Sequence, residues 1–356
     1  MSTYETHAKH LVLEYPVNPL FRKPALLAVA ALVSMTACAA ESAPATRAQA
    51  APAVSAPAKA AAAAPTPLPQ AAGAAKHTAP KKPKLEIADI TPMGEDSEKV
   101  GVGFPIIVTF DRDVRDKATA EAALEVEADK PVEGAWRWVS PRKVIYRTKT
   151  YWKPHQKVLF TARLSQIPGN EAAEDVSRRF AVGTANISVV DTRRHVMKTY
   201  RDGKIAKRIA ISAGRGGLVR NGVDVYLTTS GTHLTMGKKR VETMTSSWMG
   251  VTDPKDPQYY KEEIPWAVRI SDSGEYVHQS AGYYQYLGRS NQSHGCVRAT
   301  PEGARWFYTI AQRGDVVKIT GTKRKLDWRN GWSYWQLNWT EWKQGSALGL
   351  KMTKKS

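Results

Sequence analysis

Residues 276–298 read YVHQSAGYYQYLGRSNQSHGCVR, a short stretch that holds a histidine and a cysteine. Its first residues and the segment 267–270 predict the two strands of a hairpin, because they flank a Ser-Asp-Ser-Gly turn. His278 then stands at the end of the second strand, and Cys296 lies in a loop that contains glycine. The stretch therefore predicts a β domain with a histidine on a strand end near a loop cysteine.

The segments on either side of this stretch extend the same pattern. Thr300 and Pro301 suit the N-cap and first position of a helix that runs to about Gln312. Further strands are expected over residues 187–191, 196–200, 207–212 and 315–319. We therefore expect a mainly β domain over residues 185–323, with one helix after the cysteine loop.

Cys296 near His278 suits thiol catalysis. A thiol attacks as the thiolate and its ordinary pKa is about 8.5, so an imidazole that accepts its proton makes it a nucleophile. Gly295 allows close backbone approach, and the N–H of Cys296 can donate to an oxyanion. Two alternatives stay open on the residues alone: a cysteine that is only a small buried apolar residue, and a zinc site of His278, His294 and Cys296.

Length, charge and cysteine content narrow the classes of protein. The chain has 356 residues, a formal net charge of +19 and two cysteines. Two cysteines exclude a disulfide-dense scaffold and a four-cysteine zinc site. The excess charge lies mostly in residues 185–356, where 28 Lys and Arg accompany 14 Asp and Glu. An acidic partner is expected, but no zinc finger or aromatic-interleaved basic run points to nucleic acid.

Residues 85–184 predict a separate β domain. Four strands are expected, over residues 106–110, 135–139, 144–147 and 158–162. A short helix is expected over 117–124. This spacing of strands favours an immunoglobulin-like β-sandwich, which here has no cysteine and therefore no inter-sheet disulfide. The segment shows no nucleophile next to a base, so we expect a spacer or positioning domain.

The amino-terminal residues predict an export signal and a tether. Two basic residues, a short apolar stretch and small residues precede Cys38, a pattern that resembles a bacterial lipoprotein signal with Met35 where leucine is usual. Residues 1–37 are the expected signal, and Cys38 is the expected acylated residue that anchors the protein to a membrane. A plain signal peptide or an uncleaved anchor is the alternative. Residues 38–84, mostly Ala and Pro, are an expected linker.

His278, a gap of fourteen residues and the run Ser-His-Gly-Cys together resemble the signature of the L,D-transpeptidases, the YkuD-type cysteine enzymes of bacterial peptidoglycan. The likeness covers roughly residues 85–350 and is strongest to mycobacterial-type enzymes, which join immunoglobulin-like domains to a catalytic domain. It implies a mainly β fold: an immunoglobulin-like sandwich, a YkuD-type β-sandwich catalytic domain over 185–323, and a small Trp-rich subdomain over 324–356. The last is expected to pack on the catalytic core.

The resemblance also implies roles for individual residues. Cys296 is the expected nucleophile and His278 its general base, and the backbone carbonyl of Gln279 is expected to orient that histidine. The expected substrate-binding residues are Tyr260, Met244, Ser293, His294, Gly295 and Arg298. No metal and no cofactor are expected.

Together these expectations describe an envelope-anchored L,D-transpeptidase. Its thiol would attack the carbonyl before the terminal D-Ala of a tetrapeptide stem, and an amine of a second stem would resolve the acyl-enzyme as a 3→3 cross-link. The expected partners are donor and acceptor peptidoglycan stems, carbapenems as inhibitors and a membrane through the lipid on Cys38, without nucleic acid. The alternatives are an L,D-carboxypeptidase, an enzyme that attaches proteins to the wall, and a non-catalytic wall-binding protein.

The remaining features are expected to be structural. The tryptophans between Trp328 and Trp342 suit a packed face better than a sugar-binding platform. His233 and His195 are expected at the surface or in turns. The basic run Lys323-Arg324-Lys325 is expected to be solvated charge.

Overall fold

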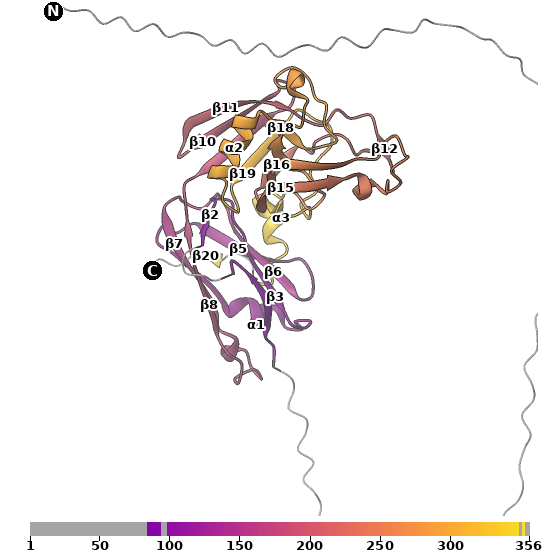
Figure 1. The fold of residues 1–356 in the computed structure, drawn as a ribbon. Helices are drawn as coiled ribbons and strands as arrows, with labels where there is room; N and C mark the ends of the chain where they lie inside the picture. The colour runs from indigo at the N-terminus through magenta and orange to yellow at the C-terminus, as the bar shows by residue number, and fades with distance from the viewer. Residues whose placement is uncertain (1–83, 94–97, 349–350, 353–356) are drawn as a thin grey trace, which may run out of the picture. The chain divides into compact units, whose positions relative to one another are not determined.

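The computed structural model describes residues 84–93, 98–348 and 351–352 (Figure 1). The expected signal, the expected lipid anchor at Cys38 and nearly all of the expected linker lie outside these residues. The described residues form two β domains, which confirms the prediction of a mainly β chain. No helix among them is long and apolar enough to cross a membrane.

The first domain is a sandwich of two β-sheets. One sheet has five strands in the order β1 (Ile87–Thr91), β3 (Ile106–Phe110), β6 (Lys143–Thr148), β5 (Glu133–Trp138) and β20 (Lys351–Met352). The other has four strands in the order β2 (Lys99–Val100), β8 (Val176–Val182), β7 (Gln156–Ala162) and β4 (Leu124–Ala128). The short helices between strands are α1 (Lys117–Ala122) and the 3-10 turn η1 (Leu164–Gln166). Because β20 comes from the far end of the chain, the C-terminal segment completes this domain.

Alternating side chains build the core between these two sheets. Val158, Phe160 and Ala162 of β7 are buried while the residues between them are not, which is the period of a strand with one face inward. The rings of Trp136 and Phe160 lie 5.8 Å apart. Aromatic packing thus contributes to the core between the two sheets.

The second domain is built on one long sheet. Its nine strands follow the order β14 (Gly231–Leu234), β19 (Val316–Thr320), β9 (Asn186–Asp191), β10 (Val196–Arg201), β11 (Lys204–Ser212), β18 (Val297–Ala299), β17 (Tyr276–Gln279), β16 (Lys261–Arg269) and β15 (Gly237–Thr245). A small hairpin is formed by β12 (Val219–Arg220) and β13 (Val223–Asp224). Two 3-10 turns are η2 (Ser246–Met249) and η3 (Tyr284–Tyr286).

Helix α2 (Pro301–Ile310) supports the strands that carry the candidate site. The helix begins where the sequence predicts, since the hydroxyl of Thr300 accepts the backbone N–H of Gly303 at 3.1 Å. Ala304 and Phe307 on its inner face belong to the same buried cluster as Val277 of β17 and Val297 of β18. Both site strands therefore rest on a packed core.

The Trp-rich C-terminal segment packs on both domains. It contacts the second domain as expected, where Gln336 donates to the Thr232 carbonyl at 2.9 Å and Asn330 accepts the Ser273 N–H at 2.9 Å. It also packs on the first domain, which was not expected. The segment contains η4 (Tyr334–Gln336) and α3 (Trp339–Lys343). Its buried cluster combines Tyr334 and Trp342 with residues of the five-stranded sheet, namely Ile107, Ala135 and Ile145. The indole N–H of Trp342 donates to the carbonyl of Ala135 at 2.9 Å.

Arginines of the sandwich contribute to the packing of this segment on the first domain. The guanidinium of Arg147 lies 4.7 Å from the ring of Trp335 and 4.8 Å from that of Trp342. The guanidinium of Arg137 lies 4.8 Å from the ring of Trp328. The face of β5 and β6 thus offers apolar area and two cations over ring faces, an attraction that aromatic spacing alone does not reveal.

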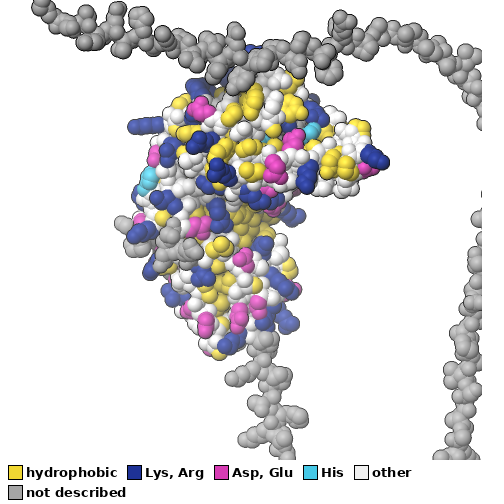
Figure 2. Space-filling model, in the orientation of Figure 1, with side chains coloured by type: hydrophobic (Ala, Val, Ile, Leu, Met, Phe, Trp, Pro, Cys, Tyr) yellow, Lys and Arg dark blue, Asp and Glu magenta, His cyan; other side chains and the backbone are white. Residues whose placement is uncertain are grey.

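Figure 2 shows Lys and Arg side chains spread over both domains, among acidic and apolar ones, rather than gathered in one patch of this face. Acidic side chains neutralise several of these charges, as in the pairs of Arg313 with Glu98 at 2.6 Å and Lys207 with Glu302 at 2.5 Å. On this face the basic side chains are therefore mixed with acidic and apolar ones, and they do not form a single patch for an anionic partner.

Candidate active site

Cys296 lies in the wall of a pocket of about 490 Å³ in the second domain. Strand β15, the turn at residues 272–275 and the cysteine loop all contribute to this wall. Met244, Trp248 and Tyr260 give it apolar and aromatic surface. A pocket of this size, with apolar and aromatic surface and several polar side chains around one thiol, has the character of a small-ligand site.

Sheet register brings His278 next to the cysteine loop. Strands β17 and β18 are parallel neighbours, and His278 pairs with Arg298. Cys296 directly precedes Val297, the first residue of β18, so the register places the end of the cysteine loop at the start of the strand next to the one that carries His278. The Cys296 thiol donates to the carbonyl of Gly274 at 3.6 Å. In this arrangement the thiol proton is directed at a backbone carbonyl.

The tautomer of His278 follows from its partner. Its Nδ1 lies 2.6 Å from the carbonyl oxygen of Gln279, and a carbonyl can only accept, so Nδ1 carries the proton and Nε2 has the free lone pair. Burial lowers the pKa of His278 to about 4. The positive charge of Arg298 also lowers this pKa, whereas the hydrogen bond to Gln279 raises it. At neutral pH the ring is therefore an uncharged base with a defined tautomer.

The Cys296 thiol is protonated in the resting protein. It is partly exposed in the pocket, but desolvation by the surrounding protein raises its pKa to about 12. A hydrogen bond from the backbone of Tyr276 and the charge of Arg298 favour the thiolate, whereas the charge of Glu275 disfavours it. The pair is thus a neutral thiol and a neutral imidazole, so proton transfer has to accompany attack.

The loop before the cysteine is held by short hydrogen bonds. The hydroxyl of Ser293 donates to the carbonyl of Cys296 at 2.5 Å and accepts the N–H of Gly295 at 3.1 Å. Gly295 has φ +133°, a region that residues with a side chain rarely adopt. The hydroxyl of Thr228 donates to the Gly295 carbonyl at 2.6 Å. These contacts fix the peptide next to the nucleophile.

Aromatic rings stack over this loop. The ring of His294 lies 5.1 Å from that of Tyr260 in a stacked arrangement, and 4.6 Å from that of Tyr226. The indole of Trp248 donates to the Tyr260 hydroxyl at 2.6 Å. Tyr260 and Met244, both expected from the resemblance, lie in the pocket wall. Tyr226 and Trp248 carried no sequence signal, because their contacts come from residues far along the chain.

Not every expected substrate-binding residue reaches the pocket. Arg298 is buried, donates to the carbonyl of Gln292 at 3.4 Å and lies 4.6 Å from the ring of Tyr283. Neither Arg298 nor Ser293 is among the described residues that line the pocket, and both instead hydrogen-bond to backbone carbonyls of the cysteine loop. Cys38 lies outside the described residues.

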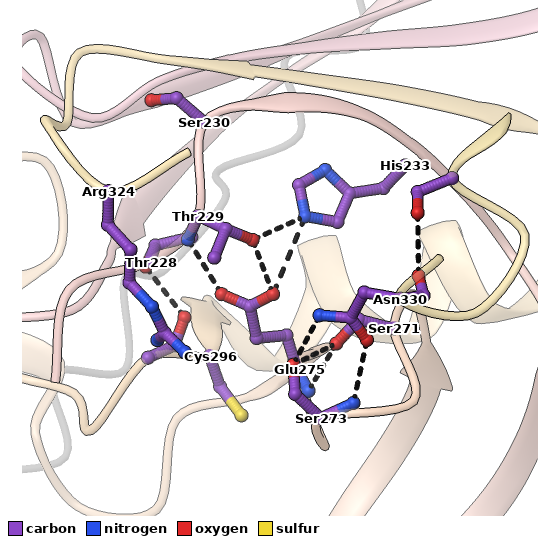
Figure 3. Close-up of polar contacts among 12 residues, drawn as sticks. Thr228, Thr229, Ser230, His233, Ser271, Ser273, Glu275, Cys296, Arg324 and Asn330 are labelled. Atoms are coloured by element: carbon purple, nitrogen blue, oxygen red, sulfur yellow. Dashed lines mark hydrogen bonds and ion pairs between the residues drawn. The ribbon is translucent and has the colours of Figure 1, made fainter. Parts of the chain in front are cut away.

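A buried polar cluster lies behind the thiol and was missed by the sequence analysis (Figure 3). Glu275 accepts two hydrogen bonds from Thr229, and its carboxylate lies 3.5 Å from Nε2 of His233. Burial alone would raise the pKa of Glu275, but the bonds and charge of His233 and the bonds from Thr229 outweigh it and lower the pKa. His233 is fully buried in β14, so its expected place at the surface or in a turn is wrong.

No group of three or more His, Cys, Asp or Glu side chains within the described ranges is placed to hold a metal ion. His278, His294 and Cys296 therefore do not form the zinc site that the residues alone left open.

Comparisons with known proteins agree with this geometry. Residues 60–168 match the model of the bacterial Ig domain, and residues 185–319 match that of the L,D-transpeptidase catalytic domain, the YkuD family. L,D-transpeptidase 2 of Mycobacterium tuberculosis is 30% identical over 259 residues, which are 72% of this chain and 61% of the relative. L,D-transpeptidase 5 of the same species is 30% identical over 262 residues, 71% of this chain and 55% of the relative.

A solved structure of an L,D-transpeptidase in complex with imipenem has a TM-score of 0.56 at 25% identity and covers 67% of this chain and 100% of its own. The fold and the site thus define the class, a mainly β domain of the L,D-transpeptidase catalytic type with a cysteine and a histidine at its candidate site. Residues 185–319 belong to the YkuD family of L,D-transpeptidase catalytic domains, preceded in this chain by a bacterial Ig domain. The chain spans only 55% to 61% of the length of the two curated relatives.

Proposed function

We propose that this protein is a peptidoglycan L,D-transpeptidase that forms 3→3 cross-links through an acyl-enzyme on Cys296. The observation that supports it most is the neutral His278, held in one tautomer by Gln279 on the strand beside the cysteine loop. The relatives named L,D-transpeptidases support the same reaction class.

Acylation starts from a protonated Cys296 thiol and a neutral His278 imidazole. The thiol passes its proton to Nε2 of His278 while the sulfur attacks the carbonyl carbon before the terminal D-Ala of a donor stem. The backbone N–H of Cys296 stabilises the oxyanion. The tetrahedral intermediate expels the amine of D-Ala, which takes the proton from the imidazolium. The products are free D-Ala and a thioester on Cys296.

Transfer to the second stem reverses the proton path. A neutral side-chain amine of a diamino acid attacks the thioester carbon and gives a proton to His278. The C–S bond breaks, and the thiolate takes the proton back from the imidazolium. The new bond is the amide of the cross-link. Water in place of the amine would make the enzyme an L,D-carboxypeptidase.

A carbapenem tests the nucleophile. Wild-type protein incubated with imipenem is expected to gain the mass of one inhibitor, and Cys296→Ala is expected to gain none. His278→Gln is expected to react about 10²- to 10⁴-fold more slowly, because it cannot accept the proton. A wild type that gains no mass would overturn the assignment of the nucleophile.

Muropeptide analysis tests the acceptor. Wild-type protein with disaccharide-tetrapeptide is expected to yield 3→3 dimers and free D-Ala. Tripeptide monomers without dimers would identify a carboxypeptidase instead. Binding to purified sacculi without any product would favour a non-catalytic wall-binding protein.

Attachment to the cell envelope is part of the proposal and rests on the sequence around Cys38. Wild-type protein is expected in the detergent phase of a membrane extract, and Cys38→Ser in the aqueous phase. Equal partition of the two proteins would contradict a lipid on this cysteine.

A further inference from the structure

Arg324 comes from the basic run that the sequence assigns to solvated charge, yet it lies in the wall of the Cys296 pocket. Its backbone is held beside Ser230: the carbonyl of Arg324 accepts the Ser230 N–H at 2.7 Å, and the Ser230 carbonyl accepts the Leu326 N–H at 3.0 Å. Lys323 and Lys325 on either side are exposed. Arg324 is thus singled out from its neighbours by position.

The guanidinium is fixed as well. Nη1 donates to the carbonyls of Val225 at 3.0 Å and Leu227 at 2.9 Å. The same segment continues to Thr228, whose hydroxyl binds the Gly295 carbonyl next to Cys296. Figure 3 shows Arg324, Thr228 and Cys296 at the same end of the polar cluster. A rigid segment therefore sets the place of this cation relative to the nucleophile.

The charge of Arg324 is not neutralised by the described residues. None of the ion pairs among them involves Arg324. It is also the only Lys or Arg in the described lining of the pocket. The acids in that lining are Glu242, which pairs with Lys239 at 3.0 Å, Glu275, which accepts two hydrogen bonds from Thr229, and Asp272. A guanidinium has five N–H donors in a planar fork that matches a carboxylate, and two backbone carbonyls occupy only Nη1.

We propose that Arg324 is a substrate-recognition residue that binds the terminal carboxylate of the donor stem, the carboxylate of the D-Ala that leaves. This inference rests on the proposed function. The leaving carboxylate is separated from the attacked carbonyl only by the amide nitrogen and one carbon, so its partner has to share a wall with Cys296, as Arg324 does. The contact forms two charge-assisted hydrogen bonds and no covalent bond.

Paired substrates test the contact. A tetrapeptide with a free C-terminal D-Ala is compared with the same peptide ending in D-alaninamide, and release of D-Ala or D-alaninamide is followed by mass spectrometry. Arg324→Gln is expected to lower kcat/KM about 10- to 100-fold for the acid and less than about threefold for the amide. Lys323→Gln, an exposed neighbour of the same charge, is expected to change neither value by more than about twofold.

The ratio of acid to amide within one variant does not depend on how much of that variant is folded, so a destabilised Arg324→Gln still gives a valid result. An equal loss on both peptides overturns the inference and leaves the proposed function intact. A wild type that releases neither product and gains no mass from imipenem overturns the proposed function, and this inference with it.

Discussion

Thr229 donates two hydrogen bonds to one carboxylate: its backbone N–H binds Oε1 of Glu275 at 2.7 Å, and its hydroxyl binds Oε2 at 2.6 Å. The same hydroxyl lies 2.9 Å from Nε2 of His233. All three residues are buried. A buried carboxylate is costly unless it is hydrogen-bonded, and this arrangement supplies the hydrogen bonds.

The position of Glu275 links this cluster to the nucleophile. Gly274 before it accepts the thiol of Cys296 through its carbonyl, and Tyr276 after it hydrogen-bonds the sulfur through its backbone. Next to Thr229, Thr228 binds the peptide that precedes the cysteine. Two adjacent threonines therefore hold both sides of the thiol in place.

Thr229→Val tests this role because valine keeps the shape and removes the hydroxyl. The variant is expected to lose about 1–3 kcal/mol of unfolding free energy, since Oε2 of Glu275 loses a donor, and to be acylated more slowly by imipenem. Thr229→Ser keeps the hydroxyl and is expected to restore the acylation rate. Urea unfolding and acylation kinetics measure the two effects. Equal acylation rates for the valine and serine variants would contradict a positioning role.

The pH dependence of alkylation tests the neutral pair. The pKa of His278 is lowered to about 4 and that of Cys296 is raised to about 12, so between these values the thiol is protonated and the imidazole is neutral. The rate of iodoacetamide reaction at Cys296 is expected to rise steadily above pH 8, with no plateau between pH 5 and 8. A plateau there would indicate a thiolate–imidazolium ion pair. Cys296→Ala is the background control.

Asp315 makes the stability of the fold depend on pH. Burial raises its pKa to about 7, against hydrogen bonds from Gln312 and Asn186. The folded state thus holds this proton more tightly than the unfolded state, whose carboxyl titrates near about 4. The stabilisation that comes from this tighter proton binding is complete below about pH 4 and is lost as the pH rises through about 7.

Asp315→Asn is therefore expected to flatten the unfolding free energy between pH 4 and 7 and to raise it above pH 7 by about 1–4 kcal/mol relative to the wild type. Urea unfolding of both proteins across this range isolates the effect, because the other titrating groups are common to them. Identical slopes in the two profiles would refute it.

Trp342 tests the docking of the C-terminal segment on the sandwich. It is fully buried and bonded to the Ala135 carbonyl, so Trp342→Ala is expected to cost about 3–5 kcal/mol. The exposed aromatic Tyr284 serves as the matched control, with an expected loss within about 0.5 kcal/mol for Tyr284→Ala. Thermal and urea unfolding measure both variants. A small loss for Trp342→Ala would show that the segment adds little to the fold.

Local signals explain why the elements of the fold could be predicted from the sequence. The strand expected over residues 106–110 is β3, because apolar β-branched residues favour a buried strand wherever they occur. The helix after the site begins at Thr300 and Pro301, because capping acts within four residues. Cys296 and His278 stand out by chemistry and spacing. Each of these signals is contained in a few neighbouring residues.

Contacts between distant segments were decided only by the tertiary structure. Glu275 and Thr229 are 46 residues apart, and no local pattern joins them. Arg324 and Lys323 are neighbours in one basic run, and nothing in the sequence distinguishes them. Only the side chain of Arg324 donates to the carbonyls of Val225 and Leu227. The Trp-rich segment shows from its spacing that it buries a face, but not which domain covers it. The sequence by itself determined the strands, the capped helix and the choice of Cys296 and His278 as candidate site residues, since local propensity and side-chain type suffice for those. The tertiary structure alone decided which buried carboxylate, cation and aromatic face meet, because pairing across long loops depends on the packing of the whole chain.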